Sequence, residues 1–290
     1  MTATKKKAAR PPILLNSYAF RDYPLEVTCE KAAQYGYDGV ELSTVHYQDE
    51  PLDSVGERIV GLTQRCGVPV TAVFFGVDLL ERDNERWERN IDRLLQGINA
   101  FAKLKITLLN ASVAPLRNPE SDERSGSWLA QDWHYERVSS ALRRLVPALE
   151  KCKSLLNLEI HMHSLHDRAR STRELLRAVA SPRVKANLDP GSLFATPGAE
   201  SAARAVELLN DDIGYLHLKN VRRVGNHFDF SHLLEEGNLD YYAILSAVRQ
   251  HGLNVPMCID YSGAGDVRRA ARRDLEYLCS LLDQLDSQCG

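Results

Sequence analysis

The chain has 290 residues, of which 44% are hydrophobic and 26% are charged, and its formal net charge is −3. This composition is typical of a globular protein, and the slight negative charge excludes a general electrostatic attraction to nucleic acids or anionic membranes. No run of residues approaches the roughly 18 apolar residues of a membrane span. We therefore expect neither a nucleic-acid partner nor a membrane contact.

The start of the chain and its cysteines both favour a cytoplasmic protein. The opening MTATKKKAARPP is basic, but the run that follows it, ILLNSYAF, is too short and too polar for a signal peptide. We expect residues 1–11 to form a mobile tail and residues 12–290 to form one folded domain. The six cysteines include no C-x-x-C pair, which is typical of reduced cysteines that pack in the interior of a cytosolic protein.

Short β-like runs alternate with helical patterns along the chain. The runs begin with ILLNSYAF and continue with GVELS, VPVTAVFFG, ITLLNAS, LLNLEIHMHS, VKANLD, IGYLHLKN and VPMCID. Helical patterns follow them at 25–35, 52–66, 84–103, from about 132 to 153, 172–180, after Pro197, and at 241–251 and 266–285. Repeated units of a strand and a helix predict a parallel sheet with right-handed crossovers.

Eight such units favour a closed (β/α)8 TIM barrel in the α/β class, with a single domain because no linker divides the chain. The alternative is a doubly wound open sheet, which usually carries a glycine-rich phosphate turn after its first strand. The corresponding stretch, SYAFRDYP, contains no glycine. The loop at 115–132 is rich in Ser, Pro, Gly and charge, and it is either a lid over the site or a disordered insertion.

Polar side chains cluster at the carboxyl ends of the predicted strands, where TIM barrels carry their active sites. LNLEIHMHS places Glu159, His161 and His163 at every second position, which predicts that they share one face of a strand. Taken singly, such residues are usually hydrogen-bonded core histidines or helix-capping aspartates. The three strands that follow add Asp189, His217 with Lys219 in phase, and Asp260.

As a set, these residues indicate a metal site. Unpaired carboxylates that point into an apolar core cost about several kcal/mol each, and one divalent cation would offset that cost for three carboxylates and an imidazole together. Oxygen-rich ligation with one imidazole suits Mn²⁺, Mg²⁺ or Co²⁺, and Zn²⁺ also accepts it. We expect one divalent metal ion, with the ligands Glu159, Asp189, His217 and Asp260.

Several motifs resemble the xylose-isomerase-like barrels, which include sugar and sugar-phosphate isomerases and epimerases and the AP-endonuclease relatives. The motifs are LEIH, NLDPGS, YLHLKN, EGNLDYYAILSAVRQHG and CIDY, and GYDGVELS resembles the family's Gly-x-x-Gly-Val-Glu pattern. The resemblance extends over residues 13–285. In the family a Glu, an Asp, a His and a final Glu bind one divalent metal, on the strands that here carry Glu159, Asp189, His217 and Asp260.

Two positions depart from the family pattern. The final Glu is Asp260, which is one methylene shorter, and the His found three residues after the metal-binding Asp is Ser192. The substrate-orienting imidazole is therefore absent or is supplied by His161 or His163. These departures argue against a standard ketose epimerase more than against the fold.

The resemblance implies proton transfer at a carbon beside the carbonyl of a small sugar-like substrate, through an enediolate. Glu159 and Asp260 are the matching pair of acid/base residues, and each would also bind the metal. His161 is expected to touch substrate, as the His of the family's Glu-x-His does. His163, one step further out, either supports His161 or is solvated.

Further side chains are candidates for substrate contact. Lys219 would bind an oxyanion, a carboxylate or a phosphate, or it forms a structural salt bridge. Glu41 lines the pocket or is hydrogen-bonded within the fold. Arg223, with Arg222 as the alternative, lies where family members carry a substrate-binding Arg. We expect Tyr18, Phe20 and Phe75 either to form an apolar wall for a sugar ring or simply to pack in the core.

Three alternatives to an isomerase or epimerase follow from the same residues. The first is a lyase, which would use the same deprotonation to eliminate a leaving group from a keto sugar, a keto-inositol, a 3-keto glycoside or a dehydroshikimate-like acid. The second is a DNA-repair nuclease, which would need further His ligands where VFFGVD and LLNASV have none. The third is a sugar-binding barrel without catalysis. The sequence leaves open whether copies of the chain or a partner subunit complete the pocket.

Overall fold

Eight parallel strands form a closed barrel in the computed structural model, which describes residues 10–120 and 124–288. Each strand is hydrogen-bonded to its two neighbours in parallel, in the order β1-β2-β3-β4-β5-β6-β7-β10 and back to β1. The strands are β1 (Ile13–Asn16), β2 (Gly39–Leu42), β3 (Val70–Gly76), β4 (Leu108–Ser112), β5 (Leu155–Glu159), β6 (Val184–Leu188), β7 (Ile213–Leu218) and β10 (Met257–Ile259). The predicted TIM barrel is confirmed.

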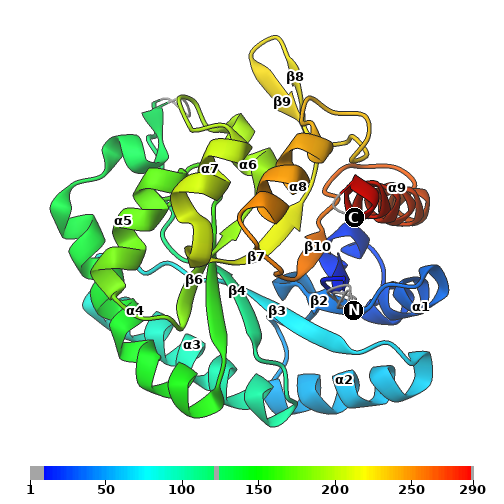
Figure 1. The fold of residues 1–290 in the computed structure, drawn as a ribbon. Coiled ribbons are helices and arrows are strands. Elements are labelled where there is room, and N and C mark those ends of the chain that lie inside the picture. Colours follow the sequence, from blue (N-terminus) through cyan, green and yellow to red (C-terminus); the bar gives the residue numbers. More distant parts are fainter. Residues whose placement is uncertain (1–9, 121–123, 289–290) are drawn as a thin grey trace, which may run out of the picture.

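Helices surround the outside of the barrel (Figure 1). They are α1 (Leu25–Tyr35), α2 (Leu52–Cys66), α3 (Asn84–Lys103), α4 (Asp132–Cys152), α5 (Ala169–Val179), α6 (Pro190–Ala195), α7 (Ala202–Leu209), α8 (Tyr241–Gln250) and α9 (Val267–Gln288). Each long helix buries one apolar stripe against the strands and leaves charged residues outside. In the described ranges, no helix combines the length and apolar character that crossing a bilayer requires.

The structure adds two elements that the sequence patterns did not predict. The single helix expected after Pro197 is α7, and the shorter α6 precedes it. A small antiparallel hairpin of β8 (Arg222–Val224) and β9 (His227–Asp229) follows β7 and projects beyond the barrel (Figure 1). Both additions lie at the carboxyl ends of strands, and they enlarge the end of the barrel where catalytic sites form.

The prediction of a continuous strand through LNLEIHMHS is wrong beyond Glu159, where β5 ends. The chain then turns, and His163 has a left-handed backbone with φ of 63°. The turn is held by the segment after β4, because His163 O accepts a hydrogen bond from Leu116 N and Leu165 N donates one to Ala114 O. The simple alternation of faces therefore stops at Glu159.

The described part of the 115–132 loop is anchored to the barrel. Residues 126–129 form a 3-10 turn, and Gly126 N donates to Leu116 O. Gly126 has φ of +71°, and a Cβ there would lie 1.8 Å from Asp167 Oδ2, so only glycine fits this approach. Of the tail predicted at 1–11, residues 1–9 lie outside the described residues, and Arg10 forms an ion pair with Asp38 at 3.1 Å.

Apolar side chains fill the barrel interior below its carboxyl end. Leu14, Ala72, Tyr215 and Cys258 pack together there, and each lies two positions before a residue that lines the carboxyl end of the barrel. A second and much larger core lies between the barrel and its helices. The packed interior gives the polar residues above it a rigid floor.

Candidate functional site

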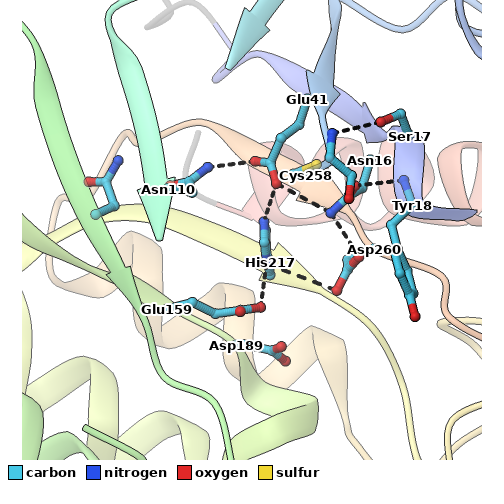
Figure 2. Close-up of polar contacts among 12 residues, drawn as sticks. Asn16, Ser17, Tyr18, Glu41, Asn110, Glu159, Asp189, His217, Cys258 and Asp260 are labelled. Atoms are coloured by element: carbon cyan, nitrogen blue, oxygen red, sulfur yellow. Dashed lines mark hydrogen bonds and ion pairs between the residues drawn. The ribbon is translucent and has the colours of Figure 1, made fainter. Parts of the chain in front are cut away.

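Four side chains of the kinds that bind metal ions converge at the carboxyl end of the barrel, one from each of four neighbouring strands (Figure 2). Each contributes one ligand atom, these atoms lie within 4.8 Å of one another, and every one of the residues is buried. They are Glu159 at the end of β5, Asp189 directly after β6, His217 in β7 and Asp260 directly after β10. The predicted ligand set is thus brought together in space.

The His217 imidazole is held between two carboxylates. Its Nδ1 lies 2.8 Å from Glu159 Oε1, and its Nε2 lies 2.9 Å from Glu41 Oε1. Tyr215 packs edge-on against the His217 ring at 5.7 Å between centroids, and Phe74 stacks on the His217 ring at 6.2 Å. A hydrogen bond from Nε2 to Glu41 leaves Nδ1 directed at the carboxylate cluster, which is the arrangement that orients metal-binding histidines.

Glu41 is fully buried and does not line the cavity above it. Besides His217, its carboxylate accepts hydrogen bonds from Asn110 Nδ2 at 2.5 Å and from Asn16 Nδ2 at 3.2 Å. Asn16 Nδ2 also lies 2.9 Å from Asp260 Oδ1, so one amide links the two carboxylates. Glu41 was a predicted substrate contact, but these bonds hold it beneath the site, where it positions His217.

Lys219 extends into the same cluster. Its Nζ lies 2.7 Å from Asp189 Oδ2, 3.0 Å from Asp260 Oδ2 and 4.0 Å from Glu159 Oε1. Burial acts to lower the pKa of Lys219, but the three carboxylates outweigh it and raise this pKa well above its ordinary value. The ammonium form of Lys219 is therefore favoured among the candidate metal ligands.

The other charges of the cluster are also set by their partners. Burial acts to lower the pKa of His217, but the carboxylates of Glu41 and Glu159 raise it well above its usual range. Burial acts to raise the pKa of Glu159, but the hydrogen bond from His217 and the nearby positive charges hold it well below its usual range. A divalent ion that bound Nδ1 of His217 would displace the proton there, and the carboxylates around this nitrogen would offset the charge of the ion.

The donor set fits a divalent metal ion. Three carboxylates and one imidazole are the hard, oxygen-rich ligands that suit Mn²⁺, Mg²⁺ or Co²⁺, and Zn²⁺ accepts them too. Cys258 also lies near His217 and Glu41, and burial raises the pKa of its thiol well above the usual value. Its side chain packs beneath the site with Leu14, Ala72 and Tyr215.

A cavity of about 330 Å³ opens above this cluster. Its polar side is formed by four side chains of the cluster, those of Glu159, His217, Lys219 and Asp260. Its wall is completed by Asn16, Tyr18, Ser43, Thr44, Phe74, His161, Met162, Phe230 and Ser262. The volume lies at the small end of the range for ligand sites, roughly 300–1,000 Å³, and suits a compact polar molecule.

The model of the family described as "Xylose isomerase-like TIM barrel" matches residues 29–281. The chain belongs to this family. A search of curated proteins found no match.

Three solved structures share the xylose isomerase-like fold over almost their whole length. An L-ribulose 3-epimerase is 18% identical with a TM-score of 0.78, and the alignment covers 96% of this chain and 97% of that one. A 3-keto-D-glucoside 4-epimerase from E. coli is 18% identical with a TM-score of 0.75, covering 93% and 100%. A probable 3-DHS dehydratase from Bacillus anthracis is 20% identical with a TM-score of 0.72, covering 92% and 98%. At these identities, the likeness establishes the fold.

Other residues predicted for this xylose isomerase-like site take different positions. His161 lines the cavity although it lies beyond β5, because the turn after Glu159 brings it back. Arg223 lies on β8, is exposed and does not line this cavity. Of the three predicted aromatic wall residues, Tyr18 lines the cavity, whereas Phe20 and Phe75 are buried in the core.

Several lining residues were missed. Asn16 ends β1 after three apolar residues, so its position at a strand end was a signal of the same kind as Asp189. Phe74 adjoins the predicted Phe75, but it points to the other face of β3. Met162 and Phe230 lie in irregular segments, where no local pattern indicates direction.

Proposed function

We propose that this protein is a divalent-metal-dependent enzyme that moves a proton at a carbon next to the carbonyl of a keto sugar or related polyol, as an isomerase or epimerase. The observation that carries the proposal is the convergence of three carboxylates and an imidazole within 4.8 Å at the floor of a small cavity. The solved epimerases of the same fold support it.

The proposed roles follow from position. Glu159 and Asp260 lie on either side of His217 and both line the cavity, so each can exchange a proton with a substrate carbon above them (Figure 2). In this role Glu159 acts in its ionised form, which the hydrogen bond from His217 favours. A bound divalent ion would polarise the substrate carbonyl and stabilise the charge that develops on its oxygen.

Lys219 and His161 would orient the substrate. The Lys219 ammonium lines the cavity and can donate to a substrate oxygen that carries negative charge. His161 Nδ1 lies 3.0 Å from Met162 O, which fixes its ring at the cavity wall. His161 is the imidazole that remains for this task, because Ser192 occupies the family's His position and its hydroxyl donates to Asp189 at 2.9 Å.

A lyase is the second candidate. The observation that favours it is the Lys219 ammonium beside Asp260, 3.0 Å apart, where a β-leaving oxygen would meet a hydrogen-bond donor after the first deprotonation. The similarity to a probable dehydratase agrees with this reaction. Isomerisation and elimination share the deprotonation step, so one experiment tests both.

That experiment is hydrogen exchange in D₂O followed by NMR. Metal-loaded protein is incubated with keto sugars, keto-inositols, 3-keto glycosides and small hydroxy-keto acids, and a substrate should gain deuterium at the carbon beside its carbonyl. Glu159→Gln with Asp260→Asn should abolish exchange. Asp211→Asn, an exposed carboxylate before β7 at the opposite end of the barrel, should leave it unchanged.

The outcomes separate the candidates. A product of unchanged composition supports an isomerase or epimerase, and loss of a leaving group supports a lyase. Exchange that persists in the double variant would show that these carboxylates are not the bases. Exchange with no compound in metal-loaded protein would favour the sugar-binding barrel over the proposed reaction.

A further inference from the structure

A second cavity of about 860 Å³ lies beside the first, between α6 and the β8–β9 hairpin. Its most distinctive walls are three aromatic rings, those of Phe194, Phe228 and Phe230. Phe194 and Phe228 meet edge to face, with 6.1 Å between centroids and 85° between planes. Phe194 is 39% exposed, so part of its ring is accessible to a ligand in this cavity.

The two cavities adjoin. Met162 and Phe230 line both of them. The Phe230 ring centroid also lies 5.9 Å from Nζ of Lys219, so this ring connects the charged cluster of the first cavity to the aromatic wall of the second. A ligand that passes these two side chains would place one end at the carboxylates and the other against Phe194 and Phe228.

The second cavity is preformed and held by polar anchors. Glu200 lines it and accepts hydrogen bonds from the backbone N–H groups of Ala169 and Arg170, which fixes this wall to the start of α5. On the opposite wall, Arg223 Nε donates to Gly225 O at 3.1 Å and Arg223 N donates to Asn238 Oδ1 at 2.8 Å. The cavity thus combines aromatic rings with polar side chains of fixed position, which is a common form of a small-molecule site.

We propose that the second cavity binds an aromatic aglycone, so that the substrate is a glycoside whose keto-sugar ring reacts in the first cavity. This inference rests on the proposed function, because it assigns the remote half of the same substrate. Perpendicular phenylalanine rings offer one face and one edge to a planar ring, and both contacts are favourable. The position of Arg223 in this wall gives it a place beside the aglycone.

Two inert glycosides test the proposal without any reaction, because neither contains a carbonyl beside an acidic carbon. Methyl β-D-glucopyranoside carries a minimal aglycone, and 4-nitrophenyl β-D-glucopyranoside carries an aromatic one. Dissociation constants are measured by calorimetry on the full chain with Mg²⁺ present. The nitrophenyl glucoside should bind at least about tenfold more tightly, the size expected for burial of one aromatic ring.

Variants show which side chains provide the tighter binding of the nitrophenyl glucoside. Phe228→Ala and Phe194→Leu should each remove most of the aromatic preference and leave the affinity for the methyl glucoside unchanged. Val224→Ala is the matched control, because Val224 is 56% exposed on the same hairpin and does not line the cavity. Saturation-transfer NMR should show the nitrophenyl protons as the strongest contacts in the unmodified protein.

Equal affinity for the two glucosides, no binding of either, or equal losses in Val224→Ala and Phe228→Ala would overturn the proposal. A dimer that dissociates in Phe228→Ala without any aromatic preference would assign this wall to a second copy of the chain instead. The proposed reaction fails separately: an aromatic preference without deuterium exchange on any substrate would leave the aglycone site standing and reject the reaction.

Discussion

The ammonium of Lys219 lies 2.7 Å from Oδ2 of Asp189, within the cluster of carboxylates that fits a divalent cation. The same nitrogen lies 3.0 Å from Asp260. Lys219 is thus a counter-ion attached to the barrel, and it shares its carboxylate partners with any bound metal. The positive charge stabilises the metal-free cluster and repels a second cation.

The first prediction concerns the competition between Lys219 and a bound metal ion for the same carboxylates. Lys219→Met should raise the affinity for Mn²⁺ by about tenfold or more, because a positive charge a few ångströms from the metal is removed. The metal-free variant should be destabilised, by roughly 3–5 kcal/mol, because the carboxylates lose their buried partner. Competition with a metal-sensitive dye measures the affinity, and urea unfolding with and without Mn²⁺ measures the stability.

Lys185→Met is the matched control for that experiment. Lys185 Nζ donates to the main-chain oxygen of Asp211, away from the cluster, so its loss should not change metal affinity. An affinity for Mn²⁺ that falls in Lys219→Met would mean that Lys219 supports the metal site rather than competing with it.

The second prediction concerns Glu41. Glu41→Gln keeps the size of the side chain but removes the charge that faces His217 Nε2 at 2.9 Å. Metal affinity should fall by about 10- to 100-fold, the usual cost of losing the group that orients a ligating histidine. The ¹⁵N shifts of His217 should move as well, because the proton on Nε2 loses its carboxylate acceptor.

Glu26→Gln, in the partly exposed pair with Arg65 at 3.9 Å, is the control for a glutamate far from the site. If Glu41→Gln bound Mn²⁺ as tightly as Glu26→Gln does, the positioning role of Glu41 would be rejected.

The barrel could be predicted because its signals are local. Each strand is a short apolar run and each long helix has its own apolar stripe, so eight alternations are visible without any tertiary information. The β8–β9 hairpin carries no such signal, because its strands have three residues each and are largely exposed. The helix α6 also carries no such signal, because it has only six residues. It begins after Asp189, whose side chain accepts a hydrogen bond from Ser192 N.

Part of the candidate site could also be predicted from the sequence, and part could not. The predicted metal ligands could be identified because the carboxyl ends of parallel strands meet at one end of a barrel. These ligands are Glu159, Asp189, His217 and Asp260. The contact between Glu41 and His217 joins β2 to β7 across the barrel, and no spacing in the sequence predicts it. The turn that returns His161 to the cavity depends on bonds to the segment after β4, which are equally non-local.

The third prediction concerns pH and Asp274 in α9. Burial raises the pKa of Asp274 to about 7, although its carboxylate accepts a hydrogen bond from Leu234 N at 2.8 Å. The folded protein therefore holds this proton more tightly than the unfolded chain, whose aspartates have a pKa of about 4. Stability contributed by the protonated form is present below about pH 4 and is lost as the pH rises to about 7, by roughly 2–4 kcal/mol.

Asp274→Asn should remove this dependence, because an amide keeps an acceptor for Leu234 N and does not titrate. The stability difference between the variant and the unmodified protein, measured by urea unfolding from pH 4 to pH 8, should grow in favour of the variant and level off above pH 7. Asp283→Asn, exposed on the same helix, should show a constant difference. Parallel curves for the two variants would refute the buried titration of Asp274.

The last prediction concerns close packing of α3 on the barrel. A Cβ added to Gly97 would lie 2.5 Å from Cε1 of Phe75, and that ring is itself held edge-on by Tyr47 and Phe101 at 6.3 and 5.9 Å between centroids. Phe75 has no room to retreat, so Gly97→Ala should destabilise the protein by about 1–3 kcal/mol.

Gly61→Ala in α2 is the matched comparison, because both glycines are helical and differ mainly in what lies over them. The nearest atom to a Cβ at Gly61 is Arg65 Nη1 at 3.5 Å, the end of a flexible side chain. This substitution should stabilise the protein by about 0.5–1 kcal/mol through higher helix propensity. Urea midpoints should move in opposite directions for the two variants with the same slope. A stabilising Gly97→Ala would mean that Phe75 can shift, and that α3 is not packed against β3 as closely as this contact requires.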